Sequence, residues 1–214
     1  MTLTKQIRQE LFKRKKRVII FIDGTNLFHS LWECYRTHIL DIQELALRLC
    51  CVNRELKQIR YYYSPFIKQI NSHMYTIQQK YLEKIKVDNN VYIAEGKYVK
   101  KPILLKRETM EKIKKLITPE DLWTYIEKGI DVKIAVDMIA LAFKDEYDVA
   151  ILISGDSDFV PVITQLKEMK KTVQVAMFMN DNRKSYELKE HSKSMIRLDY
   201  VIPPILKKQK AVNE

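Results

Sequence analysis

The stretch DVAILISGDSDFVPVI, Asp148 to Ile163, decides the fold of this chain. Its first part, Val149 to Ile153, is apolar at every position, which is typical of a strand buried on both faces of a parallel sheet. Asp156 and Asp158 follow this strand, and the apolar residues after them predict a helix. Open α/β sheets bind their ligands at the carboxyl ends of the strands, so both carboxylates stand where a ligand site is expected.

A second stretch, FIDGTNLFHS from Phe21 to Ser30, has the same organisation. An apolar run ends at Asp23, and Gly24 and Asn26 follow. One interpretation is local: Asp23-Gly24 ends a strand, and Asn26 caps the helix that follows. The other interpretation places the Asp23 carboxylate in a ligand site at the carboxyl end of a parallel strand. This segment alone leaves both open.

Apolar periodicity divides the rest of the chain into alternating strands and helices. Strands are predicted at residues 18–22, 58–63, 91–100 (with a break at Gly96), 149–153 and 172–178. Helices are predicted at residues 3–11, after Asp23, at 42–52 and 67–85, from Thr118, and at 134–141, 159–169 and 185–192. Alternating elements with uniformly apolar strands predict a three-layer α/β sandwich around a central, mainly parallel sheet.

The composition is that of a globular domain. The 214 residues are 46% hydrophobic and 30% charged, which is enough for one buried core. No apolar run approaches the roughly 18 residues of a membrane span, and the N-terminus has no signal-peptide pattern, so no membrane partner is expected. Three cysteines without CxxC spacing (Cys34, Cys50, Cys51) fit a reducing cytoplasm and argue against a zinc site. We therefore expect a cytoplasmic protein.

The net charge of +11 favours a polyanionic partner. Lys5 to Arg17 has seven basic residues and one acid, and Lys97 to Lys115 has eight basic residues and two acids. We therefore expect three regions. They are a basic N-terminal helix (1–16), an α/β domain (17–200) with a basic insertion at about 97–117, and a polar, loose C-terminal tail (201–214).

Two parallel strands that both end in aspartates bring carboxylates together. Parallel strands present their carboxyl ends at one edge of a sheet, so Asp23, Asp156 and Asp158 are expected side by side. One cap is enough for a helix, so Asp156 and Asp158 cannot both be explained as caps. Clustered like charges destabilise a fold unless a cation neutralises them, and Mg²⁺ or Mn²⁺ prefers carboxylate and water oxygens. The pattern predicts a divalent metal site.

The stretch EKGIDVKIAVDMIALAF, Glu127 to Phe143, supplies two further aspartates. Asp131 lies near the start of a predicted helix, where it is either a cap or a ligand. Asp137 follows six residues later, on a different face of that helix. Its neighbours are apolar, so its carboxylate is expected either beside a buried partner or facing a cation.

These three stretches resemble the signature segments of the NYN-domain family, within the PIN-like ribonuclease superfamily. VIIFIDGTNLF, KGIDVKIAVDMI and DVAILISGDSDFVPVI have that family's order and spacing, and the resemblance spans residues 17 to 200. It implies a three-layer PIN-like fold with an acidic Mg²⁺-binding (or Mn²⁺-binding) cleft. The positions that match the family's acidic and amide positions, and so its catalytic set, are Asp23, Asn26, Asp131, Asp156 and Asp158. The implied metal ligands are the four aspartates of this set, with Asp137 as a fifth candidate at a recurrent family position.

The function that the resemblance implies is metal-dependent hydrolysis of RNA phosphodiester bonds by an endoribonuclease. Metal ions lower the pKa of an attacking water and neutralise charge on the phosphate and the leaving oxygen. Aspartates hold such ions, and Asn26 can orient a carboxylate, a water or the substrate without adding charge. The alternative is an RNA-binding or scaffold protein with the same fold and weak catalysis. The sequence does not decide whether the chain forms a homodimer.

Other enzyme classes lack their required residues. A haloacid-dehalogenase phosphatase needs a nucleophilic aspartate two positions before Asp23, where this chain has Phe21. No GxxxxGK[ST] or GxGxxG stretch is present, which excludes the common nucleotide-binding loops. The four histidines follow no triad pattern.

Two basic segments are candidates for holding RNA. The run Lys13 to Arg17 leads into the first strand, so it starts at the amino-end edge of the sheet, roughly 17 Å from the aspartates. The insertion has no such restriction. Tyr61 to Tyr63 are expected in the core more than on RNA bases. The residues that we expect to bind RNA therefore belong to the insertion: Lys100, Lys101, Lys106 and Arg107.

Overall fold

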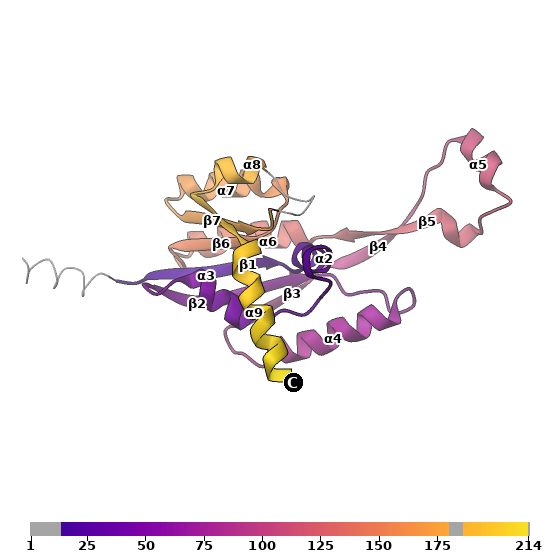
Figure 1. Cartoon of the computed structure of the whole chain (residues 1–214). Helices are drawn as coiled ribbons and strands as arrows, with labels where there is room; N and C mark the ends of the chain where they lie inside the picture. The colour runs from indigo at the N-terminus through magenta and orange to yellow at the C-terminus, as the bar shows by residue number, and fades with distance from the viewer. Residues whose placement is uncertain (1–13, 180–185, 214) are drawn as a thin grey trace, which may run out of the picture.

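The computed structural model describes residues 14–179 and 186–213 (Figure 1). Its centre is a six-stranded sheet in the order β3-β2-β1-β6-β7-β8, in which every neighbouring pair is parallel. The strands are β1 (Lys16–Asp23), β2 (Arg54–Tyr63), β3 (Val91–Glu95), β6 (Val149–Ile153), β7 (Thr172–Met177) and β8 (Ser194–Arg197). The predicted α/β fold is confirmed, and β8 is a strand that the sequence patterns did not predict.

Helices cover both faces of this sheet and complete the three layers (Figure 1). One face packs against α2 (Gly24–Tyr35), α3 (Ile42–Cys50), α4 (Ser72–Lys86) and α9 (Leu198–Asn213). The other packs against α6 (Ile130–Phe143), α7 (Val160–Glu168) and α8 (Tyr186–His191). Alternation along β1 builds both cores, because Ile20 and Ile22 pack on the first face and Phe21 on the second. Among the described helices, none is both long and apolar enough to cross a membrane.

Hydrogen bonds and ion pairs hold the amino-end edge of the sheet. The Arg17 backbone N–H and the Arg17 Nε donate to Asp148 Oδ2, at 2.8 and 3.2 Å, and tie the start of β1 to the start of β6. The same guanidinium lowers the pKa of the Asp148 carboxyl to about 2. Arg17 therefore lies at the amino-end edge, as predicted. Lys16 already belongs to β1, and the helix predicted over residues 3–11 lies outside the described residues.

The predicted strand 91–100 is two strands in two different sheets. After β3 the chain passes Gly96 and leaves the central sheet as β4 (Lys97–Pro102), which pairs antiparallel with β5 (Trp123–Lys128). A Cβ atom at Gly96 would lie 2.5 Å from Ser64 Oγ and 2.6 Å from Ile130 Cδ1, so any other residue at this break would force the Ser64 and Ile130 side chains to move. We call residues 97–128 the arm, since they project from the domain in Figure 1.

The arm carries short helical segments between its two strands. They are α5 (Arg107–Ile113) and η1 (Pro119–Leu122), a 3₁₀ turn. The helix predicted from Thr118 is wrong beyond this turn: Asp121 Oδ2 accepts hydrogen bonds from the Thr118 backbone and hydroxyl, and β5 follows directly. The β-branched and aromatic residues of β5 favour a strand over a helix.

Two further expectations differ from the structure. The helix predicted over 67–85 begins only at Ser72, because Asn71 caps it by accepting a hydrogen bond from the Met74 N–H. The tail predicted to be loose after residue 200 is instead part of α9, despite two prolines inside this helix. Ile202 and Ile205 are fully buried against the α3 side of the core, and this burial offsets the lost N–H donors of the prolines.

The docking of α9 gives a test of this packing. Ile202→Ala removes a buried side chain and should lower the free energy of unfolding by about 2–5 kcal/mol, measured by urea denaturation. Lys207→Ala changes an exposed residue of the same helix and should stay within about 0.5 kcal/mol of the wild type. Equal effects of the two changes would show that α9 is not packed on the core.

Candidate functional site

Asp23 lies at the carboxyl end of β1, directly beside the carboxyl end of β6. Ile22 pairs with Ile153 in the parallel ladder, so the residues that follow them, Asp23 and Ser154, lie side by side at the carboxyl-end edge of the sheet. The Asp23 Oδ2 accepts a hydrogen bond from Ser154 Oγ at 3.1 Å, and its Oδ1 accepts one from the Asn26 N–H at 2.9 Å. The Asp23 residue is only 5% exposed. It is therefore a buried acid held by two donors.

Asp23 itself caps α2, so the local interpretation that assigned this cap to Asn26 is wrong. The Asn26 side chain turns toward the neighbouring loop, where its Oδ1 accepts a hydrogen bond from the Gly155 N–H at 3.3 Å. Gly24 allows the close approach of α2 to β2, because a Cβ atom there would lie 2.5 Å from the Tyr62 carbonyl oxygen. Asn26 thus connects the start of α2 to the loop that follows β6.

The loop after β6 carries the next two carboxylates. The Asp156 N–H donates to Ser154 Oγ at 3.2 Å, and Asp156 Oδ1 accepts a hydrogen bond from the Asp158 N–H at 2.9 Å. Asp156 thereby caps the 3₁₀ turn η2 (Ser157–Phe159), and Asp158 is exposed. Hydrogen bonds within the loop shape it, and in the described part of the chain the second Asp156 oxygen and the Asp158 carboxylate accept none of these bonds.

Asp131 joins this group from the first turn of α6. The residue at the N-cap of α6 is Gly129, so Asp131 is not the cap. Partial burial raises the pKa of the Asp131 carboxyl, and the negative charges of Asp156, Glu127 and Asp158 raise it further. The structure therefore brings together the four aspartates predicted from the strand ends and the helix start.

Glu127 is a member of this cluster that the sequence patterns did not single out. It lies near the end of β5, and its Oε2 accepts a hydrogen bond from Thr25 Oγ1 at 2.7 Å. Its charge raises the pKa of both Asp23 and Asp131. A signal was present, since Glu127 stands four residues before Asp131. The antiparallel pairing of β5 with β4, which places Glu127 beside the cluster, could not be predicted, because the sequence from Thr118 onward predicts a helix.

Burial sets the protonation of Asp23. Desolvation raises the pKa of its carboxyl to about 7, well above the ordinary value near 4. The hydrogen bonds from Asn26 and Ser154 work in the opposite direction, and the charges of Asp131 and Glu127 add to the rise. The carboxyl end of β1 is therefore a place where negative charge accumulates and a cation is favoured.

Asp137 lies apart from this cluster. Its Oδ2 accepts hydrogen bonds from Arg60 Nη2 and Tyr62 Oη, both at 2.7 Å. Arg60 pairs in the ladder with Phe21, two residues before Asp23, and its guanidinium stacks over the Tyr92 ring at 3.8 Å. The carboxylate of Asp137 thus has a cationic partner of its own.

The residues predicted to bind RNA lie on the arm. Lys100 and Lys101 are neighbours on β4, and Lys106 stands at the N-cap of α5 with an exposed side chain. Arg107 is the first residue of α5, and its side chain lies outside the described set. The tyrosines Tyr61 to Tyr63 are buried, as expected for core residues.

Comparison of the sequence with models of protein families identifies one family that matches most of the chain. The NYN domain model matches residues 17–199, which include both acidic strand ends and the arm. This chain belongs to the NYN domain family. This match confirms the resemblance drawn from the three sequence stretches, and NYN domains are PIN-like and typically nucleases.

The fold of this NYN domain has a counterpart among solved structures. It is similar to the crystal structure of a protein of unknown function, VPA0982, from Vibrio parahaemolyticus RIMD 2210633. The TM-score is 0.57 and the sequence identity 18%, over 89% of this chain and 97% of that chain. No curated protein matched the chain. The structural likeness supports the fold of the NYN domain.

The pKa of Asp23 predicts how the stability of the metal-free NYN domain depends on pH. The folded protein keeps Asp23 protonated up to about pH 7, whereas the unfolded chain releases this proton near pH 4, so stability should fall as the pH rises through this window. Asp23→Asn imitates the protonated carboxyl and can still cap α2. It should remove up to about 4 kcal/mol of this pH dependence.

Urea unfolding in chelator at several pH values measures this difference. Comparison of the variant with the wild type at each pH isolates Asp23 from the other titrating groups. Superimposable pH profiles for the two proteins would contradict a raised pKa at Asp23.

Proposed function

We propose that this protein is a metal-dependent endoribonuclease whose site is the cluster formed by Asp23, Asp131, Asp156, Asp158 and Glu127. The observation that carries the proposal is the buried Asp23 carboxyl. It is almost excluded from water at the end of β1, and the charges of Asp131 and Glu127 raise its pKa further. Such an arrangement opposes folding unless it serves a ligand that favours negative charge, and a divalent cation is such a ligand.

The chemistry of the donors fits Mg²⁺ or Mn²⁺. These ions prefer oxygen ligands from carboxylates and keep several waters, and the cluster offers carboxylates. Within residues 14–179 and 186–213, no three histidine, cysteine or acidic side chains are already arranged around one ion position. We infer that ligation needs side-chain rotation, which the exposed Asp158 can undergo without disturbing the core.

The proposed roles follow from the contacts of each residue. A bound ion would lower the pKa of an attacking water and neutralise the phosphate. Asp131, Asp156 and Asp158 are the ligands that solvent can reach in this proposal. Asp23 would become charged only when a bound cation stabilises its carboxylate, and Asn26 fixes the loop after β6 through its bond to Gly155. Thr25 holds Glu127 toward the same edge.

RNA as the substrate is supported by charge. The chain has a net charge of +11, although its candidate site is acidic. Positive charge outside an acidic, metal-binding site attracts a polyanion that the carboxylates alone would repel. The arm supplies part of that charge next to the cluster, since Glu127 and Lys100 belong to the same pair of strands.

A second candidate function is RNA binding with little cleavage. The observation in its favour is that, in the described part of the chain, no trio of acidic side chains already surrounds an ion position. Such a protein would keep the fold and the basic arm and would not need the carboxylates for its task. The following experiment separates the two functions.

Cleavage of single-stranded RNA should need Mg²⁺ or Mn²⁺ and should stop in chelator. Asp156→Asn should lower the rate by at least about a hundredfold, because it removes one charged ligand. The fold should persist, since asparagine can accept the same capping hydrogen bond from Asp158. Ser157→Ala, an exposed change in the same loop, is the matched control and should cleave at the wild-type rate.

Two outcomes would overturn the nuclease proposal. One is equal cleavage by the wild type and Asp156→Asn in clean preparations. The other is RNA binding without metal-dependent cleavage in the wild type, which would establish the second candidate. A rise of the melting temperature with added Mg²⁺, weaker in Asp156→Asn, provides a readout of the metal that does not depend on activity.

Asp137 allows a further test, because the structure gives it the partners of a structural ion pair. Asp137→Asn leaves the Arg60 guanidinium without its charged partner in a largely buried place, so the melting temperature should fall. Cleavage by the folded variant should keep its metal dependence. A normal melting temperature together with a weaker Mg²⁺ response would instead place Asp137 among the metal ligands.

A further inference from the structure

The arm is a two-stranded ribbon with two distinct faces. In an antiparallel pair, directly opposed residues point to the same face, and successive residues alternate. The register of β4 and β5 therefore assigns every side chain of the ribbon. One face carries the pairs Tyr98–Glu127, Lys100–Tyr125 and Pro102–Trp123. The opposite face carries Lys97–Lys128, Val99–Ile126 and Lys101–Thr124.

The first face is continuous with the acidic cluster. Glu127 is bonded to Thr25 at the start of α2, and its charge acts on Asp23. Tyr98, opposite Glu127, has its pKa raised by burial and then by the charge of Glu127, as expected for neighbours on one face. The face with Tyr98 and Glu127 therefore begins beside the carboxylate cluster and continues outward along the ribbon.

Aromatic side chains follow on the same face. Tyr125 is two residues from Glu127 and Trp123 is four, which places them roughly 7 and 14 Å along the strand. Their exposed fractions, 38% and 43%, are high for side chains of this size. The Lys100 Nζ lies 4.9 Å from the Trp123 ring centroid, a cation–π contact that confirms the shared face. We call Lys100, Trp123 and Tyr125 the aromatic face.

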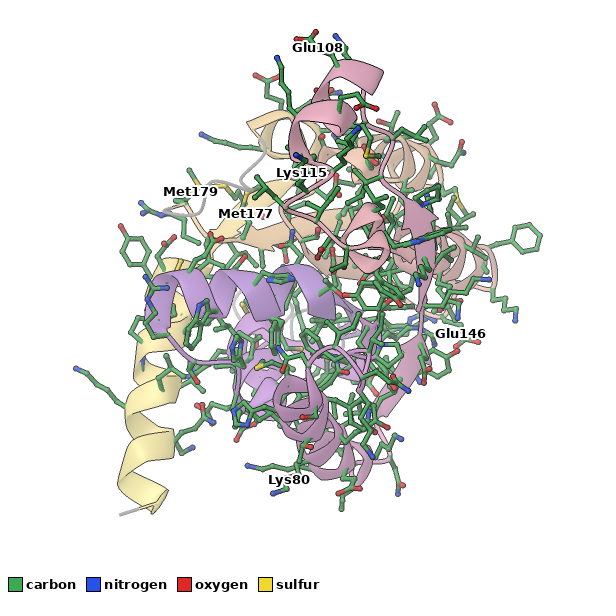
Figure 2. The ribbon with its side chains drawn as sticks, turned by 90° about the vertical axis from the view of Figure 1, so that its right-hand side faces the viewer. Lys80, Glu108, Lys115, Glu146, Met177 and Met179 are labelled. Carbon is green, nitrogen blue, oxygen red and sulfur yellow. The ribbon has the colours of Figure 1, made fainter. Side chains whose placement is uncertain are left out.

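The charge of the arm is not spread evenly. The arm has nine lysines and arginines against five acids. In the described part of α5 and the turn after it, Lys112 pairs with Glu108 and Lys114 with Glu111, so part of this charge is neutralised locally. Figure 2 shows Glu108 and Lys115 in this outer segment. On the aromatic face the described contact of Lys100 is a ring, which leaves its positive charge for an anion.

We propose that the aromatic face binds single-stranded RNA and leads it to the carboxylate cluster. This inference rests on the proposed function, and it names the form of the substrate and the residues that hold it. Unpaired bases stack on exposed aromatic rings, while a nearby cation contacts the phosphate backbone. Bases in a duplex are already stacked on each other and cannot use Trp123 and Tyr125 in this way. The aromatic face therefore selects single strands.

The opposite face of the ribbon is the matched control. Lys101 is adjacent to Lys100 and has the same charge, and from the sequence we expected both to bind RNA. The register separates the two, because Lys101 points away from Trp123 and lies opposite Thr124. We therefore no longer count Lys101 among the RNA-binding residues. Ile126 is adjacent to Tyr125 and similarly exposed, at 39%, but it offers no ring for stacking. A non-specific attraction between RNA and the arm would not distinguish these neighbours, whereas the proposed face would.

The experiment measures binding of a fluorescent single-stranded RNA of roughly 15 nucleotides to the full chain in chelator, at several salt concentrations. Trp123→Ala should weaken binding by about tenfold or more, and Trp123→Phe should restore most of it. Lys100→Ala should reduce the slope of log K against log salt by about 0.7, the value for one phosphate contact on a single strand. Lys101→Ala and Ile126→Ala should leave affinity and slope near the wild type.

Three outcomes would overturn the proposal. The first is equal losses from Lys100→Ala and Lys101→Ala, which would mean unspecific attraction. The second is equal losses for a duplex RNA of the same length in Trp123→Ala. The third is a change of molar mass in light scattering of Trp123→Ala with unchanged RNA affinity, which would make this face a contact between two copies of the chain.

Binding in chelator separates this inference from the proposed function. Loss of binding in Trp123→Ala together with no cleavage by the wild type would support the aromatic face and reject the nuclease. Cleavage by Trp123→Ala with unchanged affinity would support the nuclease and reject the aromatic face. Circular dichroism of each variant, compared with Ile126→Ala as a matched change in β5, excludes loss of the ribbon as the cause.

Discussion

The parallel pairing of β1 with β6 is the constraint on which the rest of the structure depends. Val149 to Ile153 is buried at every position, and its partner strand is buried from Val18 onward, so the register cannot shift without exposing core residues. Because the pairing of β1 with β6 ends at Ile22 and Ile153, Asp23 and Ser154 follow it side by side, within hydrogen-bond reach. The packing of the hydrophobic core therefore determines the positions of the residues at the acidic site.

The two edges of the sheet differ in their electrostatics. At the amino-end edge, Arg17 pairs with Asp148 and Lys171 with Asp145, and each aspartate has its pKa lowered. At the carboxyl-end edge, like charges gather and the pKa of Asp23 rises. Stability thus comes from the core and from the amino-end edge, while the carboxyl-end edge keeps an unfavourable charge density that a ligand can relieve.

The arm connects this edge to a surface outside the sheet. A ribbon of two strands has no core of its own, so its orientation depends on its base, where Glu127 accepts a hydrogen bond from Thr25. Alternation along β4 and β5 then gives one face a single chemical character over several residues. One glutamate therefore takes part both in the carboxylate cluster and in the attachment of the arm.

The sequence by itself determined the parallel fold and the placement of Asp23 and of the Asp156–Asp158 loop at the carboxyl-end edge of the sheet, because uniformly apolar strands and the acids directly after them are local patterns. Only the tertiary structure decided which distant segments pair. Glu127 entered the site through antiparallel pairing within the arm, and Asp137 found Arg60, 77 residues away in the chain. The polar composition after residue 200 suggested a loose tail, yet packing on α3 made a helix. Local patterns report neighbours along the chain, whereas these contacts depend on burial summed over the whole core.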